Sequence, residues 1–316
     1  MSEPQKKLPL LIANQFHVET VSRLDSLFET HKLWLQSPEQ QVQLIESLKP
    51  VCRAVATASW QTNPLIYELP GLEVISCFGV GVDGIDFNTT RSRGIFVTNT
   101  PDVLNDAVAD IAMALILATQ RNLINADQYV RSGNWSTGPF PLSHSLAGQT
   151  LGILGLGSIG EDIAIRAQTF KLEIAYHNRN RKDLPFKYYP DIHSLCENVD
   201  ILLCMLPGGA ETESIIDLEV LRSLGPNGTF INVGRGSSVN ENDLIEALRS
   251  GLIAGAGLDV YCNEPAVREQ LLSMTNVVLF PHVGSATVET RTAMGNLVIE
   301  NLLAWQAGEQ LKTPVP

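Results

Sequence analysis

The sequence lacks the features of a disulfide-stabilised or metal-clustered protein. It contains five cysteines in 316 residues, an odd number, and no C-x-x-C pair. Neither a disulfide framework nor a bound metal is therefore expected. Most of these cysteines lie in apolar, strand-like stretches, and we predict buried free thiols at Cys52, Cys77, Cys196, Cys204 and Cys262.

Positive charge is also scarce. Lys and Arg number 22 against 34 Asp and Glu, which leaves a net charge of −12. Such a chain is repelled by nucleic acids and anionic membranes, so neither is expected as a partner. No apolar run has the length of a membrane span, and the N-terminal stretch is polar, unlike a signal peptide. We expect a cytoplasmic protein.

Apolar residues are plentiful enough for two cores. Hydrophobic residues make up 44% and charged residues 18% of the chain, which is typical of an ordered globular protein. The length exceeds that of most single cores. We therefore expect two domains.

Short apolar runs alternate with helix-length segments along the whole chain. This pattern is typical of parallel sheets covered by helices on both faces, so the predicted fold class is α/β. The expected strands of the first part are residues 8–13, 32–35, 54–57, 74–77 and 95–99. Those of the second part are residues 150–154, 172–176, 201–206, 228–233, 254–260 and 277–279.

Two long helical segments indicate how the domains are connected. Residues 103–121 are apolar around most of a helix, which is too apolar for a surface helix. We expect them to connect the domains and to offer a subunit contact. A second helix is expected at residues 286–307. If it returns the chain to the first sheet, residues 1–100 and 286–316 form one discontinuous domain around a domain of residues 101–285.

A glycine-rich turn follows the expected strand at 150–154. Its three glycines are spaced as in a dinucleotide-binding loop: one allows the tight turn, one admits a pyrophosphate to the backbone, and one lets helix and strand pack closely. The amides at the start of the next helix would hold the diphosphate. The predicted contacts are Gly155, Leu156, Gly157, Ser158, Ile159 and Gly160.

The same glycine spacing occurs a second time, at residues 79–84, again after an expected strand. The segment that follows it is too short and too poor in apolar periodicity for the crossover helix of a nucleotide-binding unit. The motif at 155–160 is therefore the predicted cofactor loop.

A basic turn follows the strand at 172–176, where a site for NAD usually places an acid on the ribose 2′-hydroxyl. This chain has Asn178, Arg179, Asn180 and Arg181 there. An arginine can pair with a 2′-phosphate, whereas an acid would repel it. We predict NADP as the cofactor, with Arg179 as the main contact and the other three assisting. The alternative is a solvated basic turn.

Three candidate catalytic residues follow strands of the second part, at the edge where open parallel sheets bind ligands. Arg235 lies between glycines and offers a planar fork that fits a carboxylate. His282 can exchange a proton near neutral pH, and Glu264 would orient it and favour its charged form. The alternatives are a surface arginine in a turn and a structural histidine.

The motifs GLGSIG, VGRG, LDVYCNEP and PHVGSAT occur in this order in the second part. With them, nearly the whole chain resembles the D-isomer-specific 2-hydroxyacid dehydrogenase family. Residues 79–83 resemble the family's loop for the substrate carboxylate, and residues 100–110 resemble its helix beside the nicotinamide. The resemblance implies a Rossmann nucleotide-binding domain, a flavodoxin-like substrate domain with a cleft between them, and a homodimer.

The resemblance also implies a mechanism. NADPH delivers hydride to the carbonyl carbon of a 2-oxoacid while His282 protonates the oxygen, which gives a D-2-hydroxyacid. Arg235 holds the carboxylate, with the Val80 and Gly81 amides on its other side, and Glu264 keeps His282 oriented and protonated. Asp259 holds the nicotinamide carboxamide. The further cofactor contacts implied are Leu206, Pro207, Thr212, Val233, Gly234 and Gly284, besides Arg235 and His282.

The substrate is less closely defined by the sequence. The basic turn most resembles the glyoxylate and hydroxypyruvate reductases, with hydroxyphenylpyruvate and 2-ketogluconate reductases as alternatives. A small 2-oxoacid is favoured because no cation beyond Arg235 obviously awaits a second carboxylate. Trp60, Trp135 and Phe140 are candidates for the pocket wall, and simple packing explains each of them equally well.

Three rival interpretations stay open. Phosphoglycerate dehydrogenases often carry an added C-terminal domain, which is not expected here, and formate dehydrogenases pair the histidine with glutamine instead of Glu264. From a different class, the family's transcriptional corepressors use the fold to sense nucleotide. They sense NAD(H), however, and the basic turn favours NADP.

Overall fold

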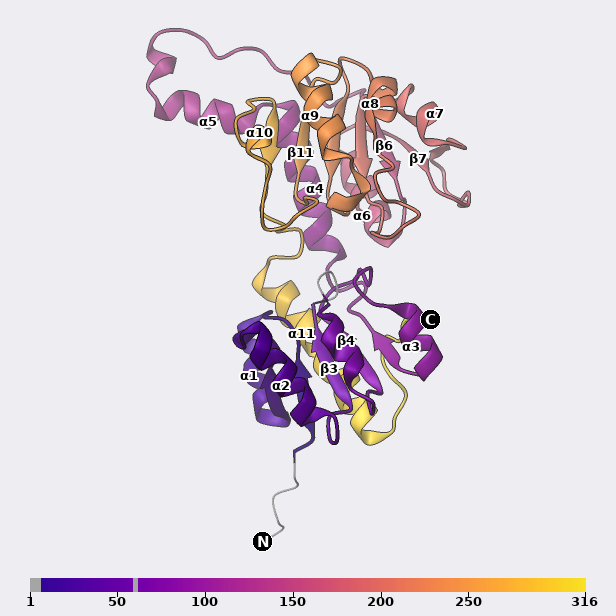
Figure 1. The fold of residues 1–316 in the computed structure, drawn as a ribbon. Coiled ribbons are helices and arrows are strands. Elements are labelled where there is room, and N and C mark those ends of the chain that lie inside the picture. Colours follow the sequence, from indigo (N-terminus) through magenta and orange to yellow (C-terminus); the bar gives the residue numbers. More distant parts are fainter. Residues whose placement is uncertain (1–6, 59–61) are drawn as a thin grey trace. The chain divides into compact units, whose positions relative to one another are not determined.

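The computed structural model describes residues 7–58 and 62–316. Its chain divides into two compact units. The first unit comprises Met1–Leu104 with Thr287–Pro316, and the second comprises Asn105–Ala286 (Figure 1). The chain thus leaves the first unit and returns to it.

The first unit contains a five-stranded sheet in which all neighbouring strands are parallel. The strand order β2-β1-β3-β4-β5 is that of flavodoxin-like folds, as predicted. The strands are β1 (Pro9–Ile12), β2 (Glu29–Lys32), β3 (Ala54–Thr57), β4 (Val74–Cys77) and β5 (Phe96–Thr98). The helices are α1 (Val18–Leu27), α2 (Pro38–Leu48), α3 (Phe87–Arg93) and α11 (Val288–Ala307).

The last helix, α11, packs on the first unit against α1 and β4. The helices α1 and α11 approach so closely that a Cβ on Gly295 would lie 1.9 Å from Thr20 Oγ1. Only glycine fits this position without a shift of α1.

One strand of the first unit lies earlier than predicted. Residues 32–35 were expected to be a strand, but β2 covers Glu29–Lys32, and Leu33–Leu35 forms a 3-10 turn. The turn buries Leu33 completely and leaves Leu35 65% exposed. Leu33 and Leu35 of the apolar run that favoured a strand therefore differ in burial, as residues of a turn do.

The second unit contains a seven-stranded parallel sheet in the order β12-β11-β10-β9-β6-β7-β8. If β6 is counted as the first strand, this is the strand order of a Rossmann fold with one strand, β12, added at the edge. The prediction of two parallel-sheet α/β units is confirmed. The strands are β6 (Thr150–Leu154), β7 (Glu173–His177), β8 (Lys187–Tyr188), β9 (Ile201–Cys204), β10 (Thr229–Asn232), β11 (Gly255–Leu258) and β12 (Val277–Leu279). The short edge strand β8 was not predicted.

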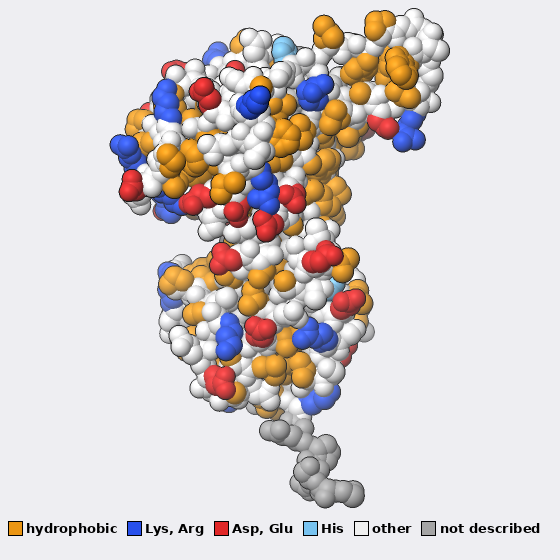
Figure 2. Space-filling model, turned by 180° about the vertical axis from the view of Figure 1, so that it is seen from behind, with side chains coloured by type: hydrophobic (Ala, Val, Ile, Leu, Met, Phe, Trp, Pro, Cys, Tyr) orange, Lys and Arg blue, Asp and Glu red, His pale blue; other side chains and the backbone are white. Residues whose placement is uncertain are grey.

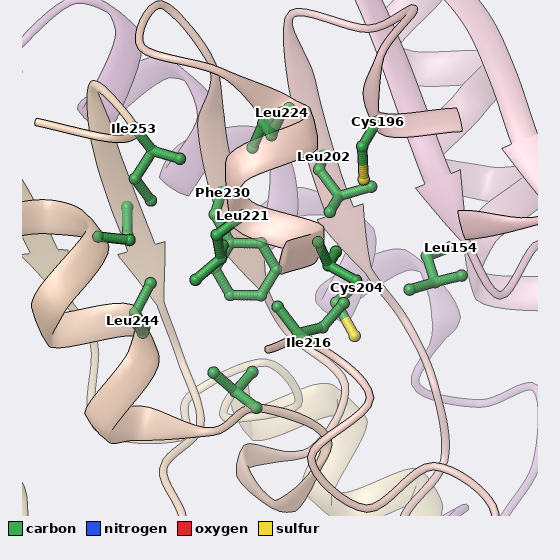
Figure 3. Close-up of a cluster of buried hydrophobic side chains, with 14 of the residues drawn as sticks. Leu154, Cys196, Leu202, Cys204, Ile216, Leu221, Leu224, Phe230, Leu244 and Ile253 are labelled. Atoms are coloured by element: carbon green, nitrogen blue, oxygen red, sulfur yellow. The ribbon is translucent and has the colours of Figure 1, made fainter. Parts of the chain in front are cut away.

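Helices cover both faces of this sheet. Phe230 and its neighbours on one face form a core with α7, α8 and α9 (Figure 3). On the opposite face, Gly257 lies against Leu115 of α4, which packs on α6. The helices are α4 (Asn105–Gln120), α5 (Leu123–Arg131), α6 (Ser158–Thr169), α7 (Ile192–Cys196), α8 (Leu218–Leu224), α9 (Glu241–Ser250) and α10 (Glu269–Leu272).

The cysteines are free thiols, as expected, and four of the five are buried. Burial raises the pKa of Cys77 and of Cys196 to about 12, so both stay protonated at neutral pH. Cys262 differs from the prediction because it is exposed. It lies on the loop after β11, where its thiol donates to the Gly236 carbonyl at 3.2 Å.

The apolar helix predicted at 103–121 is α4, and most of its apolar residues are buried within the second unit. Next comes α5, which has no buried residue and extends away from the sheet (Figure 1). Within the described ranges, no single helix is long and apolar enough to span a membrane. The pair α4 and α5, bent by 62°, passes that test only when the two are taken together.

Candidate active site

The glycine loop joins β6 to α6 and has the geometry of a phosphate cradle. Gly155 has a φ of 94°, and a Cβ on Gly160 would lie 3.2 Å from the Gly155 carbonyl oxygen. A Cβ on Gly157 would meet nothing within 4 Å, so the space above the loop is open. No side chain caps the α6 N-terminus. Its first-turn amides and the helix dipole can therefore receive an anion.

Asn178 clamps this loop from the end of β7. Its Oδ1 accepts from the Leu156 amide at 2.6 Å, and its Nδ2 donates to the Leu156 carbonyl at 3.0 Å. The predicted role of Asn178 was an assisting contact to a 2′-phosphate. The structure shows its carboxamide on the backbone of the glycine loop, and the 2′-phosphate contact stays a prediction.

The rest of the basic turn is held by other partners. Arg179, which is 84% exposed, pairs with Glu211 at 2.6 Å. The Arg181 guanidinium lies 6.0 Å from the Tyr188 ring centroid. Glu211 was missed by sequence reasoning. Glu211 follows β9, lies outside the recognised motifs and is remote in the chain from Arg179, so no sequence signal marked the pair.

The segment after β9 lies beside the glycine loop. A Cβ on Gly155 would lie 3.3 Å from Leu206 Cδ2, and one on Gly234 would lie 2.7 Å from the Leu206 carbonyl oxygen. Thr212 donates its hydroxyl to the Pro207 carbonyl at 2.6 Å. These predicted cofactor contacts therefore share one edge of the sheet.

Arg235 follows β10 and is placed by its neighbours. The Asn232 side chain accepts from the Gly234 amide and donates to the Arg235 carbonyl, both at 3.0 Å. A Cβ on Gly236 would lie only 1.9 Å from the Tyr261 carbonyl carbon. Glycine is thus required where the arginine segment passes the segment after β11.

Glu264 and His282 form a direct pair. Glu264 Oε2 lies 2.6 Å from His282 Nδ1, and Glu264 Oε1 accepts from the Tyr261 amide at 3.0 Å. Burial alone would raise the pKa of Glu264. The hydrogen bond and charge of His282, the Tyr261 amide and the charge of Arg235 outweigh burial and hold this pKa below its ordinary value. The carboxylate therefore fixes the ring and leaves Nε2 as the nitrogen for proton transfer.

Asp259 holds the loop that carries His282. Its two carboxylate oxygens accept from the Val283 and Gly284 amides at 2.8 Å each, and its carbonyl accepts from the His282 amide at 2.9 Å. Asp259 is 1% exposed, and burial raises its pKa despite these hydrogen bonds. The predicted contact to a nicotinamide carboxamide is not tested by this geometry, which shows Asp259 positioning the histidine loop.

The predicted substrate loop belongs to the first unit. Val80 and Gly81 follow β4, and Asn99 donates to the Val80 carbonyl at 2.8 Å. Of the three aromatic candidates, Trp60 lies outside the described residues. Trp135 is 68% exposed, and Phe140 packs on Tyr129 with 5.3 Å between ring centroids. Both belong to the segment after α5.

Across residues 7–58 and 62–316, no three His, Cys, Asp or Glu side chains come together as a metal site. The second unit instead combines an anion cradle, an arginine and an oriented histidine. This set can bind a nucleotide, hold a carboxylate and donate a proton.

Residues 113–284 match the family model described as "D-isomer specific 2-hydroxyacid dehydrogenase, NAD binding domain". The chain belongs to the D-isomer-specific 2-hydroxyacid dehydrogenase family. It is therefore an oxidoreductase, and the resemblance seen in its motifs is confirmed.

Several members of this family are similar over nearly the whole chain. Glyoxylate/hydroxypyruvate reductase A of Arabidopsis thaliana is 46% identical and covers 93% of this chain and 94% of its own length. Hydroxyphenylpyruvate reductase of Plectranthus scutellarioides is 44% identical, with coverages of 92% and 94%. The NADPH-dependent glyoxylate/hydroxypyruvate reductase of Sinorhizobium meliloti, solved with NADP and malonate, is 44% identical with a TM-score of 0.90 and coverages of 98% and 97%.

Proposed function

We propose that this enzyme reduces small 2-oxoacids with NADPH, glyoxylate and hydroxypyruvate first among them, to D-2-hydroxyacids. The main observation in its favour is the contact of 2.6 Å between Glu264 Oε2 and His282 Nδ1. Both residues follow strands of the sheet that also carries the glycine loop. The names of the relatives from Arabidopsis thaliana and Sinorhizobium meliloti support the same substrates.

The residues of the second unit fit a dinucleotide. The open space at Gly157 and the uncapped α6 N-terminus suit a diphosphate. When bound, NADPH supplies the hydride. Residues 155–160 would hold the diphosphate, and the remaining proposed cofactor contacts are Leu206, Pro207, Thr212, Val233, Gly234, Arg235, Asp259, His282 and Gly284.

The basic turn supports NADPH over NADH. Arg179 would be the main contact of the 2′-phosphate, with Asn180 and Arg181 assisting from the same turn and Asn178 assisting from the glycine loop that it holds. Glu211 is the present partner of Arg179 on an exposed surface, where an ion pair contributes about 0–1 kcal/mol. A 2′-phosphate, which carries more charge and more acceptor oxygens, would replace it.

The proton and the carboxylate are handled by the chain's own residues. His282, protonated and oriented by Glu264, would donate from Nε2 to the substrate carbonyl oxygen. Arg235 would bind the carboxylate and polarise the carbonyl, and the Val80 and Gly81 amides would bind the carboxylate from the first unit. The contacts of His282 and Arg235 with the carbonyl oxygen would strengthen as negative charge develops on that atom.

A reductase of larger 2-oxoacids is the second candidate. Relatives named hydroxyphenylpyruvate reductase and 2-ketogluconate reductase are 44% and 40% identical to this chain. A nucleotide-sensing protein related to the corepressors is the candidate from a different class.

The test is a matrix of initial rates with NADPH and NADH against glyoxylate, hydroxypyruvate, 4-hydroxyphenylpyruvate and 2-ketogluconate. We expect the highest kcat/KM for glyoxylate or hydroxypyruvate with NADPH. His282→Ala should lower kcat by roughly 10²- to 10⁴-fold while NADPH binding stays intact. Tight nucleotide binding without turnover of any 2-oxoacid would favour the sensor instead.

A homodimer is part of the proposal. The subunit contact was predicted on the helix that became α4, but α4 is largely buried within its own unit. One exposed apolar surface lies on the arm, defined as residues 123–145 (Figure 2). Its exposed apolar side chains are Leu123, Ile124, Val130, Trp135 and Leu142. A second copy would cover them. The cytoplasmic location remains a prediction.

A further inference from the structure

Arg291 is a half-buried cation that the proposed reaction does not use. It lies in the first turn of α11, and its guanidinium stands 5.7 Å from the centroid of the Phe78 ring. Within the part of the chain that the structure describes, the Arg291 guanidinium makes no ion pair and no hydrogen bond to a protein atom, and only the backbone amide bonds, to the Thr287 carbonyl. Burial lowers its pKa from the usual value.

Its position is unfavourable for a positive charge in two further ways. The N-terminus of a helix carries partial positive charge, so a cation in the first turn is repelled by the helix dipole. Glu289 shares that turn but is exposed and forms no ion pair with Arg291. The contact with the Phe78 ring offsets only about 0.5–2 kcal/mol. Because no described acid compensates this half-buried cation, Arg291 is suited to bind an anion from solution.

The surroundings of Arg291 indicate where this anion binds. Phe78 is the first residue after β4. It precedes the loop that contains Val80 and Gly81, the proposed ligands of the substrate carboxylate. Phe16, which follows β1, stacks on Phe78 with 5.1 Å between ring centroids. Both strands end at the same edge of the first sheet because they are parallel. Arg291 and the substrate loop therefore belong to one edge of one unit.

We propose that Arg291 binds a second carboxylate on the substrate, so that the enzyme also accepts 2-oxo dicarboxylic acids. The guanidinium fork can hold this group in a charge-assisted, bidentate contact beside the loop that holds the first carboxylate. This inference rests on the proposed function. It changes the expectation from sequence that no cation beyond Arg235 awaits a second carboxylate.

The experiment compares oxaloacetate with 2-oxobutyrate, a monocarboxylate of the same chain length, using NADPH. We expect Arg291→Gln to lower kcat/KM for oxaloacetate roughly 10- to 100-fold and that for 2-oxobutyrate less than about threefold. The loss should appear mainly in KM, and Arg291→Lys should restore part of it. The dissociation constant for NADPH should not change.

Arg91→Gln is the matched control. The Arg91 guanidinium also lies over a phenylalanine ring of the first unit, 5.2 Å from the centroid of Phe87. Unlike Arg291, Arg91 is exposed and lies in the last turn of its helix, α3, where the helix dipole favours a positive charge. We expect it to leave both substrates unaffected. Equal losses for both substrates in Arg291→Gln, or a wild type that reduces glyoxylate but not oxaloacetate, would overturn the inference. A wild type that reduces neither glyoxylate nor hydroxypyruvate would overturn the proposed function itself.

Discussion

Glu264 stays ionised in the folded protein at pH values where a free glutamate takes up a proton. Burial opposes this, but the contacts to His282, Tyr261 and Arg235 outweigh it, so the pKa in the folded state lies below the ordinary value of 4.5. A carboxyl group whose pKa is lowered by folding contributes stability above its unfolded pKa. That contribution is lost as the pH falls through the folded pKa.

Replacing Glu264 by Gln should remove both effects of this charge. Below about pH 4.5, the free energy of unfolding should fall less steeply with decreasing pH in the variant than in the wild type. At neutral pH, kcat should fall roughly 10²- to 10⁴-fold because the carboxylate that orients the His282 ring is lost. Urea unfolding at several pH values and initial rates measure the two effects. Glu213→Gln, on an exposed acid, is the control. An unchanged kcat would exclude the proposed role of Glu264.

The pair of Arg179 and Glu211 gives a prediction on cofactor choice. Glu211→Gln should raise the affinity for NADPH by up to about fivefold, because Arg179 no longer has a competing acid. Arg179→Ala should weaken NADPH binding and leave NADH binding unchanged. Both affinities can be measured by nucleotide fluorescence titration, and the differences should shrink at high salt. If either variant changed both nucleotides equally, Arg179 would not contact the 2′-phosphate.

At the scale of elements, the loop between β6 and α6 depends on the end of β7. The Asn178 carboxamide bonds both the amide and the carbonyl of Leu156, so it needs a donor and an acceptor at once. Aspartate would keep only the acceptor and would bring a charge against the Leu156 carbonyl. The residue that stands where NAD sites carry an acid thus also shapes the diphosphate loop.

Asn178→Asp and Asn178→Ala should weaken NADPH and NADH binding by similar factors, about tenfold, since the loop serves the part common to both nucleotides. The weaker binding should raise KM for the nucleotide more than it lowers kcat. Asn198→Ala, at an exposed asparagine of the same unit, is the control. A loss confined to NADPH would show that Asn178 acts on the 2′-phosphate, as the sequence alone suggested.

The sequence predicted the elements better than the contacts between them. Apolar runs located most strands because parallel strands are buried on both faces, but they misplaced β2, where Leu33 turns into the core. Motif spacing located Arg235, Glu264 and His282. Glu211 and Arg291 could not be found that way, because their partners Arg179 and Phe78 are remote in the chain. The contacts of Asp259 with Val283 and Gly284 likewise appear only in the folded chain.

At the scale of the whole molecule, each unit carries part of the proposed site. Val80, Gly81 and Arg291 belong to the first unit, whereas the glycine loop, Arg235, Glu264 and His282 belong to the second. The proposed proton donor and nucleotide contacts thus belong to the second unit, whereas both units carry proposed substrate contacts. A substitution in one unit can change the substrate range without touching the nucleotide contacts, which is the basis of the Arg291 experiment.

The arm provides the last prediction, on assembly. Helix α5 has no buried residue, so packing against its own chain stabilises it little. Exposing its leucine, isoleucine and valine side chains to water is unfavourable, and a second copy that covered them would lower the free energy. The double variant Leu123→Glu/Ile124→Glu should therefore convert a dimer into a monomer at micromolar concentration. Sedimentation velocity measures this change. Gln128→Glu, which adds a negative charge to another exposed position of α5, should stay dimeric. A monomeric wild type would show that the apolar surface of the arm has a different partner.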